Sequence, residues 1–536
     1  MNAVIRMEAA GGLAVTTTVD TSASRAQLIA DDTPARLAAK DSTLWGPAAE
    51  AEAAVRLGWV DTHERSRDLV PRLADLRSKL RDKGLTRVVL AGMGGSSLAP
   101  EVITRTLDVP LTVLDTTDPG QILAALGEDL ENTVVVVSSK SGGTVETDSH
   151  RRAFWQAFED HGLSDVGGRF VIVTDPGSPL EATGREMGAE VILADPDVGG
   201  RYSALTAFGL VPSALAGVDI AELLDQAEDF AESITDEKDN PALALGAALA
   251  SAKTVTIAPD GSGIVGLGDW AEQLIAESTG KDGLGILPVV VDSPSSPGFD
   301  GRDVLPVTVG GSAVGNLSSS GHLELAAVAV NGPLGAQFLA WELATAYAGK
   351  LIGIDPFNQP NVTESKNNTN AILEGGLPDE EPSFTEGDVE VYGGEGDTLA
   401  SVLRNLIGSI GDEGYLAVMA YLDRVGDAPA EGLRDLLAVV TPAPVTFGWG
   451  PRFLHSTGQF HKGGRLTGAF LQITGAVRDD LDVPGRPYTF GDLQAAQAAG
   501  DRQAIDKRSR PLLRLHLTDR SAGIGQIVAA VKESTT

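Results

Sequence analysis

A run of valines that ends in small hydroxyl residues and two glycines constrains this chain more than any other feature. Residues Thr133–Val137 have the continuous apolar pattern of a buried parallel strand. The strand leads into Ser138-Ser139-Lys140-Ser141-Gly142-Gly143-Thr144, and a polar helical segment follows. Hydroxyl groups, free backbone N–H groups and the positive end of a helix dipole then meet at one point, which suits a phosphate dianion. The spacing is not that of a P-loop.

A second strand–glycine–helix junction lies upstream. Here Val88-Val89-Leu90-Ala91 leads into Gly92-Met93-Gly94-Gly95-Ser96-Ser97. Because ligands of open α/β sheets bind at the carboxyl ends of the strands, the two junctions predict one site for a sugar phosphate. A dinucleotide-dependent dehydrogenase is disfavoured, since the GxGxxG spacing is missing and no ribose-binding acid is evident.

Composition narrows the class of protein. The 536 residues carry a formal net charge of −33 and contain no cysteine. The charge disfavours nucleic acid and anionic membranes as partners, and the lack of cysteine excludes disulfides, thiolate catalysis and Cys-ligated zinc. The sequence shows neither a membrane-spanning apolar run nor a signal peptide. We therefore expect a cytoplasmic enzyme with a small-molecule substrate and neither a nucleic-acid nor a membrane partner.

The order of the expected elements indicates the α/β class, with two doubly wound parallel-sheet domains and helical extensions. The expected divisions are a helical N-terminal extension (1–80), a first, phosphate-binding domain (81–235), a second α/β domain (236–480) and a C-terminal segment that packs back on the body (481–536). The expected strands are Arg87–Leu90, Leu111–Leu114, Thr133–Val137, Phe170–Val173, Val191–Leu193, Thr254–Ile257, Leu287–Val291, Leu416–Ala420, Val445–Phe447, Leu471–Thr474 and Leu512–Leu517. Residues 204–252 are expected to form a helical crossing, and Pro378–Gly396 an exposed loop or insertion.

One candidate site segment is Asp197-Val198-Gly199-Gly200-Arg201-Tyr202-Ser203. The glycines allow the backbone to approach a ligand closely, and Arg201 offers a fixed fork of donors to an oxyanion. The alternative is an ordinary loop arginine that caps a helix or pairs on the surface.

A second candidate segment is the predicted helix that ends at Gly280. Gln273 and Glu277 are four residues apart and therefore share one face of this helix. If it is partly desolvated, the carboxylate of Glu277 suits proton abstraction. The alternative is a pair of exposed polar residues on a surface helix.

A third segment, residues 450–464, holds two of the seven histidines between glycines. His455 and His461 invite a metal site, but no carboxylate lies beside them at ligand spacing. Histidines that position a substrate hydroxyl fit this segment better, and no metal site is predicted.

Together these segments resemble the glucose-6-phosphate isomerase family over residues from about 45 to 530. The nearest branch is the isomerase half of transaldolase–isomerase fusions, which has a segment like His455-Ser456-Thr457-Gly458-Gln459-Phe460-His461-Lys462-Gly463-Gly464. The resemblance implies two sugar-isomerase (SIS-like) domains and catalytic roles for Arg201, Glu277, Lys462 and His455. It places substrate binding at Gly95, Ser96, Ser139, Lys140, Ser141, Thr144 and Gln273. It also implies a homodimer without a cofactor.

One departure from the family affects ring opening of the sugar. The family has a histidine in a Gly-Gln-His-Ala-Phe segment, whereas the corresponding residues here, Leu334–Glu342, contain none. His455 is the first candidate for the missing acid, followed by Glu342 and His322. Here Ser141 stands for the usual threonine and Gly142-Gly143 for a bulkier pair, from which we expect a more pliable phosphate loop.

The activity that the resemblance implies is aldose–ketose isomerisation of glucose 6-phosphate to fructose 6-phosphate, in glycolysis and gluconeogenesis, through a cis-enediolate. Glu277 would move the proton between C2 and C1, and Arg201 would stabilise the developing charge. Two alternatives remain open on the sequence, namely a broader isomerase that also accepts mannose 6-phosphate and a non-catalytic sugar-phosphate sensor. The joint presence of Glu277, Arg201 and Lys462 favours an enzyme over a sensor.

Overall fold

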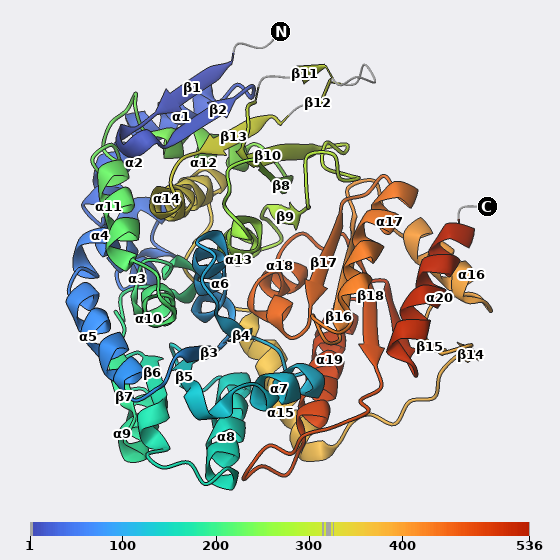
Figure 1. Ribbon diagram of the computed structural model, residues 1–536. Coiled ribbons are helices and arrows are strands. Elements are labelled where there is room, and N and C mark those ends of the chain that lie inside the picture. The colour runs from blue at the N-terminus through green and yellow to red at the C-terminus, as the bar shows by residue number, and fades with distance from the viewer. Residues whose placement is uncertain (1–3, 314–315, 318–322, 325, 535–536) are drawn as a thin grey trace.

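Three sheets of five or six strands, each flanked by helices, make up the computed structural model (Figure 1) within the described residues, which are 4–313, 316–317, 323–324 and 326–534. A short antiparallel pair, β11 (Asn316–Leu317) and β12 (Leu323–Glu324), lies apart from them. The predicted α/β class is therefore confirmed, with mostly parallel sheets. None of the helices in the described ranges is both long and apolar enough to cross a membrane.

The first sheet is parallel throughout, in the order β4-β3-β5-β6-β7. Its strands are β3 (Arg87–Gly92), β4 (Thr112–Leu114), β5 (Thr133–Ser138), β6 (Phe170–Thr174) and β7 (Glu190–Leu193). Because side chains alternate along a strand, Val88 and Leu90 join one core while Val89 joins the opposite one. The first core includes α5 (Leu69–Asp82), α6 (Leu98–Thr106) and α10 (Ala207–Ala216), and the opposite one includes α7 (Pro119–Gly127), α8 (Val145–Asp160) and α9 (Pro179–Met187). All five strands were predicted.

The second sheet is mixed, in the order β1-β2-β13-β10-β8-β9. Its strands are β1 (Ile5–Glu8), β2 (Ala14–Thr17), β8 (Thr254–Asp260), β9 (Leu287–Val290), β10 (Val304–Gly310) and β13 (Val328–Asn331). The strands β13, β10, β8 and β9 are parallel, and the hairpin of β1 and β2 adds to β13 antiparallel. A purely helical N-terminal extension is therefore the wrong prediction for its first part. The buried Leu13 and Val15 draw this hairpin onto the sheet despite the alanine-rich sequence around them.

Helices pack against this sheet and against one another in the upper left of Figure 1. They are α1 (Ser22–Ala30), α2 (Thr33–Ala38), α3 (Glu50–Ala53), α4 (Thr62–Arg65), α11 (Ile220–Ala231), α12 (Pro241–Ala250), α13 (Leu267–Thr279) and α14 (Leu334–Ile352). The predicted helical crossing over 204–252 is confirmed by α10, α11 and α12. In α14 every residue from Leu334 to Gly349 is buried, because this helix is enclosed on all sides.

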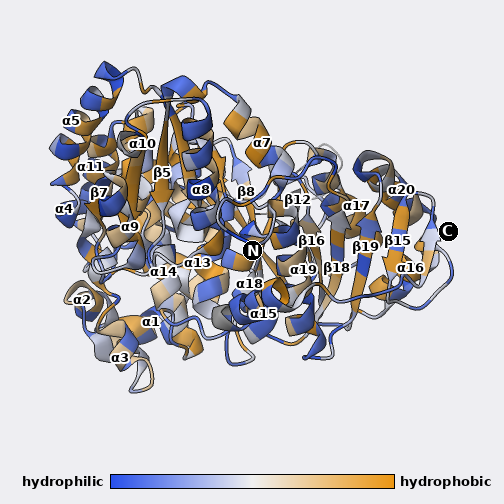
Figure 2. Cartoon of the chain, turned by 90° about the horizontal axis from the view of Figure 1, so that it is seen from below, coloured by the Kyte–Doolittle hydropathy of each residue, from blue (hydrophilic) through white to orange (hydrophobic). Residues whose placement is uncertain are grey.

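The third sheet has the order β14-β15-β19-β18-β16-β17. Its strands are β14 (Phe384–Glu386), β15 (Val389–Tyr392), β16 (Tyr415–Tyr421), β17 (Val445–Trp449), β18 (Gly468–Gly475) and β19 (Leu512–Leu517). One face is covered by α16 (Leu399–Gly408), α17 (Gly432–Val440) and α20 (Arg520–Glu533), and the other by α18 (Gly458–Gly463) and α19 (Phe490–Asp506). In Figure 2 the strands of this sheet are largely apolar, as a doubly covered sheet requires.

Two expectations change here. The stretch Pro378–Gly396 is not all exposed loop, because β14 and β15 extend the third sheet and Val389 and Val391 are fully buried. The expected second domain, 236–480, has strands in two different sheets, and the later of these is completed by β19 from the C-terminal segment. The exact domain boundaries stay a prediction.

Candidate active site

Two glycine-rich turns meet at the carboxyl ends of the strands of the first sheet. The turn η4 (Gly94–Ser96) follows β3, and η7 (Gly200–Tyr202) follows β7. A Cβ atom on Gly95 would overlap the carbonyl oxygen of Gly200, so only glycine allows the two backbones to touch. A Cβ on Gly94 would lie 2.8 Å from Nε2 of Gln273 and 2.9 Å from the carbonyl oxygen of His455. The structure thus brings together four segments that are distant in the sequence.

Arg201 and Glu277 are in contact and almost wholly buried. Nη1 of Arg201 lies 3.4 Å from Oε2 of Glu277, and their side chains are 3% and 7% exposed. The same carboxylate oxygen accepts a 3.2 Å hydrogen bond from Nε2 of Gln273, one turn earlier on α13. The alternatives of a surface arginine and an exposed polar helix face are therefore wrong.

Further hydrogen bonds fix the guanidinium of Arg201. Its Nε donates to Oγ of Ser278 at 2.9 Å, and its Nη2 donates to the carbonyl oxygens of Pro356 and Asn358, each at 2.9 Å. Nη1 also donates to Oε1 of Gln359 at 3.3 Å. All three nitrogens of this fork point to oxygen atoms, which holds the cation in one orientation.

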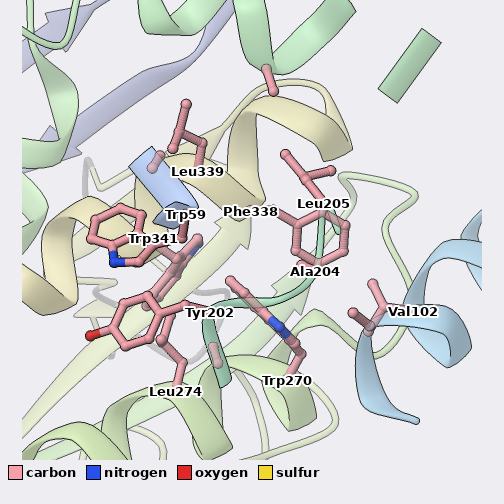
Figure 3. Close-up of a cluster of buried hydrophobic side chains, with 14 of the residues drawn as sticks. Trp59, Val102, Tyr202, Ala204, Leu205, Trp270, Leu274, Phe338, Leu339 and Trp341 are labelled. Carbon is pink, nitrogen blue, oxygen red and sulfur yellow. The ribbon is translucent and has the colours of Figure 1, made fainter. Parts of the chain in front are cut away.

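An aromatic cluster packs around Tyr202, the residue after Arg201 (Figure 3), and the guanidinium of Arg201 lies 5.9 Å from the centre of the Tyr202 ring. Tyr202 stacks on Trp59 with ring centroids 5.0 Å apart, and its hydroxyl lies 3.1 Å from Oγ of Ser278. Trp270 of α13 packs edge-on against Phe338 of α14 at 4.8 Å. Such packing locks rotamers, so the apolar face of α13 positions its polar face.

Sequence reasoning missed Lys281, although this residue directly follows Gly280, where the helix that carries Glu277 ends. It is 1% exposed, and its Nζ donates to the carbonyl oxygens of Asp355 and Asn358 and to Oδ1 of Asn358 at 2.6 to 2.8 Å. Burial, followed by the charge of Arg201, lowers the pKa of Lys281, whereas the three oxygen acceptors around Nζ favour its charged form. Gln359, which accepts from Arg201, was also not predicted as a site residue. It lies in a polar stretch after an apolar helix, and that stretch carries no motif.

The predicted phosphate loop lies between β5 and α8. Oγ of Ser139 lies 2.9 Å from Oγ1 of Thr144, and no side chain caps the N-terminus of α8. Ser141 is exposed and its Oγ accepts from the backbone N–H of Gly143 at 3.3 Å. Two hydroxyls and the uncapped first turn of a 16-residue helix offer donors to an anion. Lys140 points elsewhere, because its Nζ pairs with Oδ2 of Asp175 at 2.5 Å.

The glycines of this loop differ in role. Gly142 has φ +68°, and a Cβ there would meet the backbone nitrogen of Leu180 at 2.8 Å. Gly143 has room for a Cβ, with only Oγ of Ser141 at 4.0 Å. The local backbone therefore requires glycine at position 142 but leaves room for a side chain at position 143.

His455 ends the short turn η9 (Arg452–His455) that follows β17. Its Nε2 lies 3.0 Å from Oε1 of Glu146 in the first turn of α8, and the same oxygen accepts from Nε2 of Gln497 at 2.7 Å. Burial raises the pKa of Glu146, but His455 and Lys366 outweigh burial and lower it to about 2. The segment after β17 of the third sheet therefore contacts α8, the helix that follows the predicted phosphate loop.

Lys462 is not brought into contact with Glu277 or Arg201 among the described side chains. Its Nζ pairs with Oδ1 of Asp501 at 2.6 Å, and the two side chains are 3% and 1% exposed. His461 is a core residue, because it stacks on Tyr415 and its Nδ1 lies 2.9 Å from the hydroxyl of that residue. Burial, with the charges of Lys462 and Arg510, lowers the pKa of His461 to about 3.

Of the two further candidates for the ring-opening acid, Glu342 is described by the structure and His322 is not. Glu342 is buried in α14, and neither carboxyl oxygen has a hydrogen-bond partner among the described residues. Burial raises its pKa well above the usual value, which favours the neutral acid. His322 lies outside the described residues.

A cavity of about 860 Å³ lies beside this cluster and includes none of Glu277, Arg201 or Ser139. Asp269 and Glu272 of α13 line it, together with Arg452 and Ser456. Arg452 bridges Glu101 at 2.6 Å and Asp115 at 2.5 Å. Burial and then the charge of Asp269 raise the pKa of Glu272 to about 8. Glu277, the predicted base, therefore lies on a neighbouring face of α13, outside this cavity.

Comparisons with known proteins point in one direction. A family model described as phosphoglucose isomerase matches residues 63–284, which include η4, the phosphate loop, η7 and Glu277. A probable glucose-6-phosphate isomerase of Haloarcula marismortui is 31% identical over 349 residues, which cover 55% of this chain and 79% of that protein. The glucose-6-phosphate isomerase of Rippkaea orientalis is 37% identical over 213 residues, covering 37% of this chain and only 40% of that protein.

Solved structures agree in fold. A hypothetical protein of Thermus thermophilus superposes with a TM-score of 0.55 at 25% identity, covering 66% of this chain and 96% of that one. A glucose-6-phosphate isomerase of Chlamydia trachomatis gives a TM-score of 0.56 at 20% identity over 69% of this chain and 90% of its own. Each of these comparisons therefore leaves about a third of this chain uncovered.

Proposed function

Since the chain belongs to the phosphoglucose isomerase family, we propose that it is a glucose-6-phosphate isomerase that interconverts glucose 6-phosphate and fructose 6-phosphate. The observation that carries this proposal is the buried contact of 3.4 Å between Arg201 and Glu277 beside the glycine turns. A carboxylate and a fixed cation in one dry site are the two groups that an enediolate intermediate requires.

Glu277 is the base of the proposed reaction. It removes the proton from C2 of the open-chain aldose; the electron pair of that C–H bond forms the C1–C2 double bond of the cis-enediolate, and the π electrons of the carbonyl pass to O1. Return of the proton to C1, with loss of the proton on O2 and gain of one on O1, gives the ketose. Gln273 holds one carboxylate oxygen at 3.2 Å, which leaves the other free for the substrate. Arg201 stabilises the charge that develops on the substrate oxygens.

In this proposal the phosphate group of the substrate binds at the N-terminus of α8. Ser139, Ser141 and Thr144 supply hydroxyl donors, and Gly95 and Ser96 lie on the neighbouring turn η4. Lys140 takes part only if it exchanges Asp175 for the phosphate, since the two side chains form an ion pair. Binding energy from the phosphate holds C1 and C2 against Glu277.

Ring opening needs a proton donor near the sugar. His455 suits this task better than Lys462, because its side chain is 17% exposed and bound by one hydrogen bond to Glu146. Lys462 is 3% exposed and ion-paired with Asp501. We therefore assign ring opening to His455 and give Lys462 a supporting role within the third sheet.

The cellular setting is also a proposal. The proposed interconversion of glucose 6-phosphate and fructose 6-phosphate supports action within glycolysis and gluconeogenesis, and a chain without cysteine is compatible with the cytoplasm. The family resemblance supports a homodimer, which light scattering of the purified protein tests directly.

A coupled assay tests the function. Fructose 6-phosphate is supplied with glucose-6-phosphate dehydrogenase and NADP, and NADPH formation is followed by its absorbance. We expect steady turnover that depends on the added protein. Tight binding of fructose 6-phosphate without turnover would support a sensor and contradict the proposal. Mannose 6-phosphate in a parallel assay measures substrate breadth.

A further inference from the structure

Lys281 and Arg201 are two buried cations that share one loop. This loop runs from residue 353 to residue 361, between α14 and α15 (Val362–Gly375). The carbonyl oxygen of Asn358 accepts from Nη2 of Arg201 at 2.9 Å and from Nζ of Lys281 at 2.6 Å. Arg201 also takes the carbonyl of Pro356, and Lys281 takes the carbonyl of Asp355. Backbone carbonyls of this loop therefore bind both side chains, and the carbonyl of Asn358 is shared between them.

The loop has its own internal supports. Oδ1 of Asp355 accepts from the backbone N–H groups of Phe357 and Asn358 at 2.8 and 3.3 Å, which closes a tight turn. The ring of Phe357 packs edge-on against Trp45 at 4.8 Å. Lys281 supplies the donors for the side of the turn that faces α13, with Oδ1 of Asn358 as its third acceptor at 2.8 Å.

Burying the amine of Lys281 costs desolvation free energy, and the hydrogen bonds to these oxygens offset part of it. An ammonium has three N–H donors, and the three acceptors use all of them. Arg201 repels Lys281, whereas the carboxylates of Asp355, Glu277 and Asp282 attract it. Removing the amine would leave the carbonyl of Asp355 and Oδ1 of Asn358 without this donor, and the carbonyl of Asn358 with Arg201 as its remaining donor. The turn that holds Arg201 would then lose part of its support.

We propose that Lys281 is a positioning residue for Arg201, acting through the backbone of residues 355–358. The inference rests on the proposed isomerase function. Lys281 does not touch the substrate; it holds the carbonyl oxygens that orient the guanidinium toward Glu277 and the enediolate. Its loss should therefore weaken transition-state stabilisation more than substrate binding.

The test is the Lys281→Met variant in the coupled assay, with Lys253→Met as the matched control. Lys253 is a surface lysine, 59% exposed, that pairs with Glu413. We expect Lys281→Met to lower kcat about 100-fold, the order of loss that a misplaced catalytic group causes, with KM changed less than about threefold. Lys253→Met should match the wild type. Lys281→Arg, which keeps a cation and several donors, should recover part of kcat.

A double variant separates positioning from a merely structural effect. In an Arg201→Met background, adding Lys281→Met should cost less than about threefold in kcat, because the residue it positions is already gone. Multiplicative losses in this cycle, or a Lys281→Met enzyme with wild-type kcat, would overturn the proposal. If Lys281→Met does not fold, Asn358→Ala replaces it, with a smaller expected loss of kcat and the same coupling to Arg201. Failure of the wild type to turn over substrate would contradict the proposed function instead.

Discussion

The Nε2 atom of His455 lies 3.0 Å from Oε1 of Glu146, so a segment of the third sheet contacts the helix that follows the phosphate loop. The two residues are 309 positions apart in the chain. Gln497 of α19 reaches the same carboxylate oxygen at 2.7 Å. This carboxylate therefore connects the first sheet to the third at the edge of the proposed site.

Glu146 should make a pH-dependent contribution to stability. Its pKa in the folded protein, about 2, lies below the usual 4.5, so the contribution is complete above about pH 4.5 and is lost as the pH falls toward 2. We expect Glu146→Gln to lower the free energy of unfolding by about 1–3 kcal/mol at pH 7. Urea unfolding from pH 7.5 to pH 4 should show this difference narrowing below about pH 4.5. A difference that stays constant with pH would contradict the assignment.

His455 should act on the closed sugar ring. We expect His455→Asn to slow turnover of fructose 6-phosphate while leaving the inhibition constant of arabinose 5-phosphate nearly unchanged, because that sugar is more often open. Steady-state inhibition with both proteins measures this. Equal losses in turnover and in affinity for arabinose 5-phosphate would assign His455 to loop support alone, and Glu342 would be the next residue to test.

Gly142 and Gly143 offer a matched pair of substitutions in the phosphate loop. Gly142→Ala forces an L-residue to φ +68° against Leu180, a cost of about 1–2 kcal/mol, or about 5- to 30-fold in an equilibrium constant. We expect this to raise KM by that order with little change in kcat, since the phosphate is the same in ground and transition states. Gly143→Ala should leave KM unchanged. Equal KM values for both variants would show that the loop is as pliable as the double glycine suggested.

Lys462 should matter for stability more than for chemistry. Removing one partner of a buried ion pair costs about 3–5 kcal/mol, because the other charge is left unpaired. We therefore expect Lys462→Met to lower the free energy of unfolding by that amount, and Lys462→Met with Asp501→Leu to recover most of it. A stable Lys462→Met protein with a kcat reduced by orders of magnitude would restore the catalytic role implied by the family resemblance.

The parallel strands and their carboxyl-end loops could be predicted from sequence because local signals agree there. The valines of β5, the glycines of η4 and the end of α13 at Gly280 each fix one local conformation. Arg201, Gln273 and Glu277 could be proposed as site residues from the same local signals, and the structure brings the three side chains into contact. Their mutual contact joins the turn after β7 of the first sheet to α13, which follows β8 of the second sheet. It therefore depends on how the two sheets pack together, which local patterns do not predict.

Other features depend on tertiary context that local patterns do not carry. The hairpin of β1 and β2 is short and rich in alanine and threonine, and only pairing with β13 defines it. Likewise β14 and β15 lie in an acidic, glycine-rich stretch and form because β19 offers a free edge. Lys462 lies in a segment that resembles the family motif, which made it a candidate for catalysis. Its partner Asp501 is distant in the chain, and no sequence pattern links the two residues. Lys281 was overlooked since its acceptors are mainly backbone carbonyls, which any sequence supplies.

The proposed function depends above all on proton transfer by Glu277, and a single substitution isolates that step. Gln has the shape of Glu and keeps a contact to Arg201, but it cannot accept the C2 proton. We expect Glu277→Gln to bind fructose 6-phosphate with nearly wild-type affinity and to lose isomerisation by several orders of magnitude. The decisive measurement is NMR of glucose 6-phosphate in D₂O, which follows exchange of the C2 hydrogen with solvent. We predict that this exchange stops in Glu277→Gln, whereas exchange at the wild-type rate would show that another group is the base.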